Sequence, residues 1–204
     1  VFIYNQPQRS GRLTEWHQDT FAEVAQFCRK RQEYSHKTQT VPQVAILHSN
    51  TSYYLNNDPL FNFAGAKQAL EGAMQSLLEN GYSVDILNEE ALVGRMGQYR
   101  MVVVPEAEAV PDYVKDALRK YVGDGGRLLL SGVHVAEQYG DLAGVEKREG
   151  DPQDGWLPVD GRAVKIAAKF QPVTLKGATE LAPVLYQQEP DLNRRDMAAA
   201  TRNE

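Results

Sequence analysis

Four short apolar runs recur between residues 43 and 144, and helical patterns separate them. Each run is mostly unalternated and is followed by a polar or chain-breaking residue, which is typical of a strand buried on both faces. The runs are Val44–Leu47, Val84–Leu87, Met101–Val104 and Arg127–Leu130. Strands that alternate with helices predict a parallel sheet covered by helices on both sides. We therefore expect a doubly wound α/β domain over residues 41–145, with its crevice at the carboxyl ends of the strands.

The intervening segments carry helix signals at the expected places. Apolar residues recur at helical spacing between Ala66 and Leu78, and Gly81 follows as a stop signal. Asn88-Glu89-Glu90 is a capping start for a short helix that runs to about Met96. Pro111 suits the first turn of the next helix, whose buried stripe is Val114, Leu118, Tyr121 and Val122. A weaker helical pattern extends from Val135 to about Leu142.

The first 40 residues carry a strand-like run, a loop and one amphipathic helix. Val1–Tyr4 is the strand-like run, and apolar residues recur behind Asp19 and Thr20 up to Cys28. Cys28 lies on the apolar side of this helix and is interpreted as a small buried hydrophobe. The polar stretch up to Thr40 is interpreted as a linker. Residues 1–40 therefore resemble the last unit of a preceding α/β domain.

Residues 146–204 have a different pattern. A connector rich in Gly, Asp and Pro runs from Glu146 to Gly161. Val164–Lys169 and Pro172–Leu175 then indicate two strands of a further β-module. The polar tail from Glu189 to Glu204 is expected to be disordered.

Charge and cysteine content exclude several classes of function. The net charge is −5 and no basic cluster is longer than Arg29-Lys30-Arg31, so we expect no nucleic-acid partner. No apolar stretch approaches the roughly 20 residues that a membrane-spanning helix needs. A single cysteine, Cys28, allows neither an internal disulfide nor a cysteine-based metal site. The expected compartment is periplasmic or extracellular if the longer protein carries a signal peptide, and cytoplasmic otherwise.

The position after the fourth run, where doubly wound folds often carry a nucleophile, is Ser131-Gly132-Val133-His134. A nucleophile elbow of the G-x-S-x-G or G-x-C-x-G type needs a glycine two positions before the nucleophile, and Leu129 stands there instead. Gly123–Gly126 precedes a strand and not a helix, so it is no phosphate-binding loop. We therefore expect no catalytic nucleophile in this segment and no bound cofactor.

Five polar residues fall at or just past the ends of the predicted strands and are the crevice candidates. A histidine beside a carboxylate could perform acid–base chemistry or hold a metal if the two met in space. These candidates are His48, Ser49, Glu106, Ser131 and His134. Loop residues at strand ends are polar in any fold, so a structural or interface role is favoured over catalysis, and no metal site is predicted.

The segment Thr51–Asn62 is interpreted as a long loop that carries Tyr53, Tyr54 and Phe61. A plain sheet domain has no need of so long a loop with exposed aromatic residues. These three residues are therefore the candidates for an interface.

The order of these motifs resembles part of a known enzyme family. Tyr4–Pro7, Gly11–Trp16 and a helix that ends in Arg29-Lys30-Arg31 look like the junction between a (β/α)8 barrel and the next domain in large glycoside hydrolases. Met101–Pro105 and Tyr121–Leu128 resemble the β-galactosidase trimerisation domain, a non-catalytic relative of class I glutamine amidotransferases.

The resemblance implies a flavodoxin-like domain that is an accessory part of a larger enzyme. The catalytic barrel would belong to the same polypeptide but lie outside this chain, and the glycosidic bond of a carbohydrate substrate would be cleaved there. The accessory domain would pack on the barrel and support a homo-oligomer. Two alternatives stay open: an enzyme that works through the crevice, either amidotransferase-like or metal-assisted, and a carbohydrate-binding module.

Overall fold

The computed structural model describes residues 6–41, 43–56, 67–185 and 194–203. Within it the chain divides into two compact units, Val1–Thr40 and Val41–Glu204. Each unit is described by itself.

The first unit contains one long helix, α1 (Glu15–Ser35). It begins four residues before Asp19 and ends at Ser35, within the polar stretch where the helix is expected to end. No residue of α1 is buried, and Cys28 is only half-buried. The expectation that Cys28 is a core residue is therefore wrong within this unit. The strand-like run Val1–Tyr4 lies outside the described residues.

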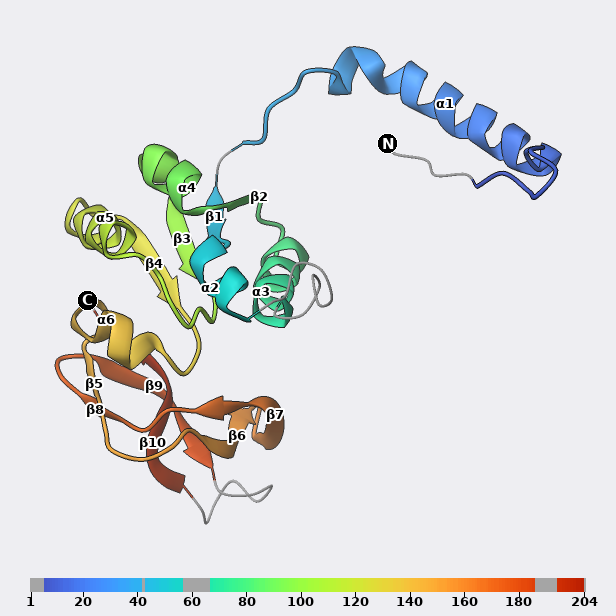
Figure 1. The fold of residues 1–204 in the computed structure, drawn as a ribbon. Helices are drawn as coiled ribbons and strands as arrows, with labels where there is room; N and C mark the ends of the chain where they lie inside the picture. Colours follow the sequence, from blue (N-terminus) through green and yellow to red (C-terminus); the bar gives the residue numbers. More distant parts are fainter. Residues whose placement is uncertain (1–5, 42, 57–66, 186–193, 204) are drawn as a thin grey trace. The chain divides into compact units, whose positions relative to one another are not determined.

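In the second unit, four parallel strands form one sheet in the order β2-β1-β3-β4, which confirms the predicted α/β class (Figure 1). All four strands coincide with the four apolar runs. They are β1 (Val44–Leu47), β2 (Val84–Leu87), β3 (Met101–Val104) and β4 (Arg127–Leu130). The order matches the first four strands of a flavodoxin-like sheet.

Helices cover the two faces of this sheet unequally. On one face α3 (Gln68–Glu79) packs on Val44, Ile46 and Val103. The other face carries the larger core, in which residues such as Leu92, Leu118 and Tyr139 come from three further helices and a short 3-10 turn. These elements are α4 (Glu89–Arg95), η1 (Met96–Gln98), α5 (Asp112–Gly123) and α6 (Val135–Ala143).

The two outer strands of the sheet are less buried than their sequences suggest. Every residue of β1 is buried, but Ile86 on β2 is 44% exposed and Leu129 on β4 is 50% exposed. The prediction that all four runs are buried on both faces is therefore wrong for β2 and β4. Both are edge strands, and α3 alone does not reach across the whole sheet face.

The segment after β1 also differs from its prediction. Asn50–Asn56 forms a short helix, α2, where a long loop is expected. Ser49 caps this helix, because its hydroxyl oxygen accepts the Ser52 N–H at 3.1 Å. Residues 57–66, and with them the interface candidate Phe61, lie outside the described residues.

The remaining strands form a β-part with two antiparallel sheets, in the orders β10-β9-β6-β7 and β5-β8. The two predicted strands correspond to β7 and β8. Arg194–Arg202 forms strand β10, which pairs with β9 and buries Met197, so disorder is the wrong expectation for this part of the tail. The strands are β5 (Val145–Lys147), β6 (Gln153–Val159), β7 (Arg162–Phe170), β8 (Val173–Leu175), β9 (Thr179–Leu185) and β10 (Arg194–Arg202).

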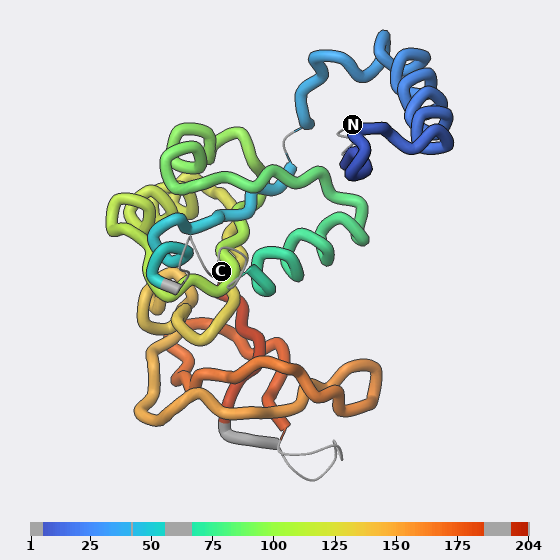
Figure 2. The backbone as a smooth tube through the Cα atoms, turned by 45° about the vertical axis from the view of Figure 1, so that its right-hand side comes forward, coloured from blue at the N-terminus to red at the C-terminus, as the bar shows by residue number. Residues whose placement is uncertain are grey.

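Hydrogen bonds join the β-part to helix α6. The Gly144 carbonyl, just after α6, accepts the N–H of Lys176 at 2.7 Å and of Ala178 at 3.3 Å. The Asn203 side chain donates to the Leu142 carbonyl at 2.9 Å. Figure 2 shows the chain passing from α6 directly into these strands. The α/β part and the β-part therefore share backbone contacts near residue 145, where the sequence composition suggests a boundary.

Candidate functional site

The crevice candidates lie at the carboxyl ends of three strands of the parallel sheet. His48 and Ser49 follow β1, Glu106 follows β3, and Ser131 and His134 follow β4. The structure brings Glu106 and His134 together, and it gives His48 and Ser49 other partners. The five candidates therefore do not form one cluster.

The Glu106 carboxylate bridges two groups at the turn between β4 and α6. Its Oε2 accepts the Val133 N–H at 2.5 Å, and its Oε1 is in close contact with Nδ1 of His134. An ionised carboxylate can only accept hydrogen bonds, so we assign the ring proton to Nδ1. Both side chains remain about a third exposed, 37% for His134 and 33% for Glu106. Solvent therefore screens this contact, and its contribution to stability is at most about 1 kcal/mol.

Gly132 makes this close approach possible. Its φ is +117°, a conformation that L-residues with a side chain rarely adopt. A Cβ atom at this position would overlap the Glu106 carboxylate. The glycine after Ser131 is thus required by the carboxylate that sits against the turn.

The space at this turn is narrow, although Glu106 and His134 remain partly exposed. Its walls include Glu106, Ser131, His134 and Tyr139, and it leaves no volume for a water molecule. Among the described residues, the Ser131 hydroxyl makes no hydrogen bond to His134. Activation of a serine nucleophile needs such a bond to a neighbouring base. The arrangement provides a carboxylate–imidazole pair but no activated nucleophile.

Ser49 belongs to a second polar group, centred on the buried Glu89. Glu89 is 4% exposed and Ser49 is 7% exposed. The Ser49 hydroxyl lies 2.9 Å from both Glu89 Oε1 and the Ala109 carbonyl, and it donates to one of them at a time. Glu89 Oε1 also accepts the Thr51 N–H at 3.1 Å. The carboxylate of Glu89 therefore holds the first turn of α2.

The ionised form of Glu89 is stabilised in place. Burial by itself would raise the pKa of Glu89, but several hydrogen-bond donors outweigh burial and lower it below 4.5. These donors are the backbone N–H groups of Thr51, Glu89 and Asn50 and the hydroxyl of Ser49. The sequence marks Glu89 only as the first residue of α4, where Asn88 caps the helix as predicted. The sequence does not reveal that Glu89 also holds the start of α2. The one sequence signal for a helix there is Ser49, a residue type that favours the N-cap position, shortly before Tyr53 and Tyr54.

His48 and the two tyrosines of α2 form a short row of aromatic rings. The ring centroids of His48 and Tyr53 are 5.4 Å apart and those of Tyr53 and Tyr54 are 5.5 Å apart, both in edge-to-face geometry. Tyr54 is 65% exposed and its neighbour Leu55 is 63% exposed. The interface candidates Tyr53 and Tyr54 thus lie on a helix that presents an apolar side chain and an aromatic ring to the outside.

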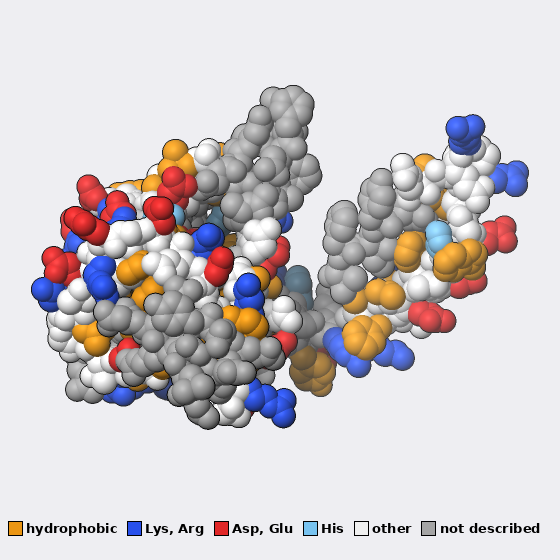
Figure 3. Space-filling view, turned by 90° about the horizontal axis from the view of Figure 1, so that it is seen from below, with side chains coloured by type: hydrophobic (Ala, Val, Ile, Leu, Met, Phe, Trp, Pro, Cys, Tyr) orange, Lys and Arg blue, Asp and Glu red, His pale blue; other side chains and the backbone are white. Residues whose placement is uncertain are grey.

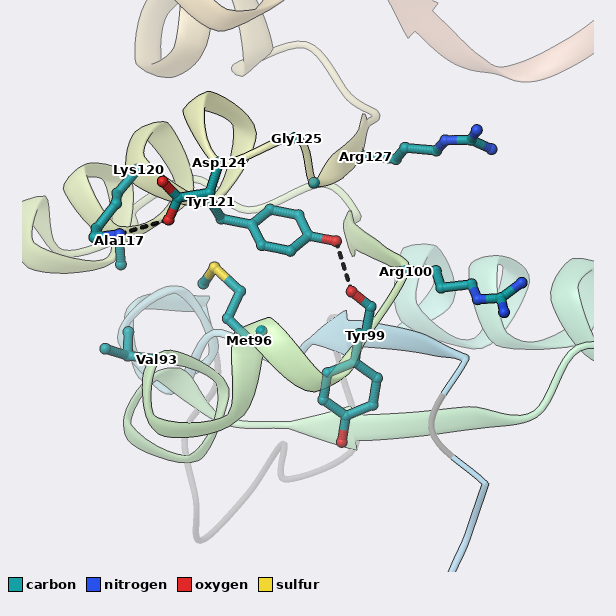
Figure 4. Close-up of a pocket in the computed structure, with 12 residues that line it drawn as sticks. Val93, Met96, Tyr99, Arg100, Ala117, Lys120, Tyr121, Asp124, Gly125 and Arg127 are labelled. Atoms are coloured by element: carbon teal, nitrogen blue, oxygen red, sulfur yellow. Dashed lines mark hydrogen bonds and ion pairs between the residues drawn. The ribbon is translucent and has the colours of Figure 1, made fainter.

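A further hollow lies at the amino ends of the strands. A groove of about 800 Å³ runs between α4 and α5, with walls that include Met96, Tyr99 and Tyr121 (Figure 4). The guanidinium groups of Arg100 and Arg127 extend to the same side, away from Met96. Topology favours ligand binding at the carboxyl ends of the strands, whereas the larger volume is at their amino ends. We place the candidate functional site at the carboxyl ends of the strands, because the polar groups that contact one another lie there.

Two features are absent from the part of the chain that the structure describes. No group of three or more His, Cys, Asp or Glu side chains could hold a metal ion there. No described helix is both long and apolar enough to cross a membrane.

Comparisons with known proteins give matches among solved structures alone. No protein-family model matches the chain, and no curated protein sequence does. A GH42 β-galactosidase from G. stearothermophilus is similar with a TM-score of 0.73 and 18% identity, over 96% of this chain and 30% of that one.

Two further structures resemble the chain in the same way. An α-L-fucosidase isoenzyme 2 from Paenibacillus thiaminolyticus gives a TM-score of 0.69 at 16% identity, over 98% of this chain and 32% of that one. A β-galactosidase from the psychrophilic Marinomonas ef1 gives 0.61 at 14% identity, over 88% and 30%. The chain therefore spans about a third of the length of each of these proteins. At these identities the likeness establishes the shared fold.

Proposed function

We propose that this chain is a non-catalytic accessory domain of a larger glycoside hydrolase, whose glycosidic bond cleavage takes place in a barrel outside this chain. One observation carries the proposal. Nearly the whole chain superposes on about a third of a GH42 β-galactosidase and of an α-L-fucosidase. A segment shared by enzymes with different names is more simply a supporting part than the catalytic one.

The polar groups at the carboxyl ends of the strands favour a non-catalytic role. Glu106 and His134 bind each other and the backbone, and Glu89 and Ser49 hold helix α2. Each of these polar groups already has a partner that serves the fold. We therefore propose that the chain has an amidotransferase-like fold without amidotransferase chemistry.

The first unit supports the presence of a preceding domain. Helix α1 exposes large apolar side chains, which gather along it in Figure 3. They are Trp16, Phe27 and Tyr34, and Leu13 just before the helix is also exposed. A helix with an uncovered apolar face is stable when it packs against further structure. We propose that this further structure is the catalytic barrel of the same polypeptide.

Helix α2 supports a role in assembly. Its Tyr54 and Leu55 are exposed beside the row formed by His48 and Tyr53. Aromatic residues that are held in place and exposed are enriched at the energetic centres of interfaces. We propose that α2 contacts a neighbouring copy in a homo-oligomer, as a trimerisation domain would.

The test is to assay the full-length protein on a panel of chromogenic glycosides beside the 204-residue chain alone. We expect turnover by the full-length protein only, because the catalytic carboxylates would lie outside this chain. Turnover by the chain alone, at a rate within tenfold of the full-length protein, would contradict the proposal. No turnover of any glycoside by either would contradict the assignment to a glycoside hydrolase.

The contact between Glu106 and His134 favours one second candidate, an enzyme that works through the crevice. A carboxylate-oriented imidazole is the arrangement of a general base. This candidate predicts turnover by the chain alone and its loss in the His134→Ala variant. The same assay therefore separates the two functions.

A further inference from the structure

Helix α3 ends in a tight backbone cap. The Gly81 N–H donates to the Leu78 carbonyl at 3.0 Å. The Tyr82 N–H donates to the Leu77 carbonyl, also at 3.0 Å. Together with the positive φ of Gly81, +78°, these two bonds form a Schellman motif. The motif favours glycine at position 81, because a residue with a side chain would be strained at this φ.

The residue before this glycine is an exposed asparagine. Asn80 is the only asparagine in the sequence that a glycine follows. Asparagine is among the heat-labile residues, because its side-chain amide is open to attack by the next backbone nitrogen. Gly81 has no Cβ atom that would shield its nitrogen from the side chain of Asn80. The requirement of the cap for glycine therefore places a labile pair of residues at the end of α3.

We propose that Asn80 is a site of spontaneous deamidation and that the native cap of α3 keeps it closed. In the reaction, the Gly81 nitrogen loses its proton to solvent base and attacks Cγ of Asn80. The new C–N bond closes a cyclic imide, the Cγ–Nδ2 bond breaks, and ammonia leaves. Water then adds at one of the two imide carbonyls, which gives aspartate or isoaspartate. This inference is independent of the accessory role.

The native geometry of Asn80 prevents closure of the imide. Closure needs the Gly81 nitrogen to be eclipsed with Cβ of Asn80, whereas a ψ of 9° eclipses it with the backbone nitrogen of Asn80. The ψ angle must therefore change by about a third of a full turn, because Cβ and that nitrogen are separate tetrahedral substituents of Cα. The side chain is also held, since Nδ2 of Asn80 donates to the Ser76 carbonyl at 2.8 Å. The cap must open before the reaction, as helix ends do in local unfolding.

The product weakens the end of α3. An aspartate at position 80 puts negative charge at a helix C-terminus, where the macrodipole disfavours it. It also lacks the NH₂ group that donates to the Ser76 carbonyl. Isoaspartate adds a backbone carbon within the cap. Helix α3 packs on Val44, Ile46 and Val103, and its Leu77 belongs both to that packing and to the cap. Deamidation of one exposed residue therefore loosens the packing on one face of the sheet.

The test is to incubate the chain in mildly alkaline buffer, folded and in denaturant, and to map aspartate and isoaspartate by peptide mass spectrometry. In denaturant we expect Asn80 to react faster than any other asparagine. In the folded chain it should react at least about tenfold more slowly, because only the open fraction of the cap reacts. Equal rates at Asn80 in both conditions would show that the cap gives no protection. A faster reaction at another asparagine in denaturant, or none at Asn80, would overturn the assignment of the site.

Two matched variants test the consequence for α3. Asn80→Asp should lower the urea midpoint at neutral pH, whereas Asn88→Asp should leave it nearly unchanged. Asn88 caps the N-terminus of α4, where its Oδ1 accepts the Ala91 N–H at 3.0 Å, and aspartate is an equally good cap there. An unchanged midpoint for Asn80→Asp, or an equal fall in both variants, would contradict the weakening of α3. If Asn80→Asp does not fold, the rates in the wild-type chain still decide whether Asn80 is the protected site.

Discussion

At the scale of single residues, close approaches of backbone and side chain decide which positions of this fold tolerate change. Gly126, in the turn between α5 and β4, is such a position. A Cβ atom there would overlap the ring of Tyr121, whose hydroxyl donates to the Tyr99 carbonyl at 3.0 Å. The ring is fixed at both ends, so it has no room to give way.

We therefore expect Gly126→Ala to lower the free energy of unfolding by about 1–3 kcal/mol, the usual cost of overpacking. Gly123→Ala is the matched control. Gly123 ends α5 and has no atom within 4 Å of its added Cβ, so this change should be neutral or slightly stabilising. Urea unfolding of both variants measures the difference, and equal midpoints would contradict the steric argument.

At the scale of elements, helix α2 shows how a buried charge determines a segment that local sequence leaves open. A helix of seven residues is marginal by itself, because forming its first turn is unfavourable. Ser49 and Glu89 satisfy the N–H groups of Ser52 and Thr51 at its start. The helix therefore depends on a residue 38 positions away along the chain.

Glu89→Gln should lower the free energy of unfolding by about 1–3 kcal/mol at pH 7, because the buried hydrogen-bond network loses the negative charge of its acceptor and one carboxylate oxygen becomes an NH₂ donor. The pKa of Glu89 is lower in the folded than in the unfolded protein, so its contribution is present above the unfolded value of 4.5. It is lost as the pH falls through the folded value.

Urea unfolding of the wild type and Glu89→Gln between pH 3 and 7 checks this expectation. The difference between the two proteins should shrink as the pH falls below 4.5. Glu90→Gln serves as the control, since Glu90 is exposed and should show little difference at any pH. A wild-type advantage that does not depend on pH would mean that the charge of Glu89 is not what matters.

At the scale of the whole molecule, the proposed role depends on which surfaces remain uncovered. Helix α2 leaves Tyr54 exposed at the carboxyl edge of the sheet, whereas Tyr113 is a similarly exposed tyrosine on α5. If α2 contacts a neighbouring copy, these two tyrosines should differ in their effect on assembly.

We expect Tyr54→Ala in the full-length protein to weaken the oligomer by about 2 kcal/mol or more, as loss of an interface hot spot does. The mass in solution, measured over a range of protein concentrations, should fall at concentrations where the wild type stays assembled. Tyr113→Ala should behave as the wild type does. An unchanged mass for Tyr54→Ala would remove α2 from the interface while leaving the accessory role itself untested by this variant.

The sequence by itself determined the four parallel strands and, apart from α2, the helices of the α/β part. The runs Val44–Leu47 and Met101–Val104 are apolar without alternation, and burial on both faces at the centre of a parallel sheet is the environment that such a run requires. Local signals such as Asn88 and Gly81 act within a few residues, so they could be identified from the sequence alone.

Only the tertiary structure decided which polar residues meet. The contact between Glu106 and His134 joins residues 28 positions apart, and Glu89 reaches Thr51 across 38 positions. The exposure of Ile86 and Leu129 follows from the order of the strands, which makes β2 and β4 the edges. Strand β10 forms because β9 offers an edge to pair with, although its own residues are mostly polar. Periodicity reports what a segment buries, whereas its partners depend on how distant segments pack.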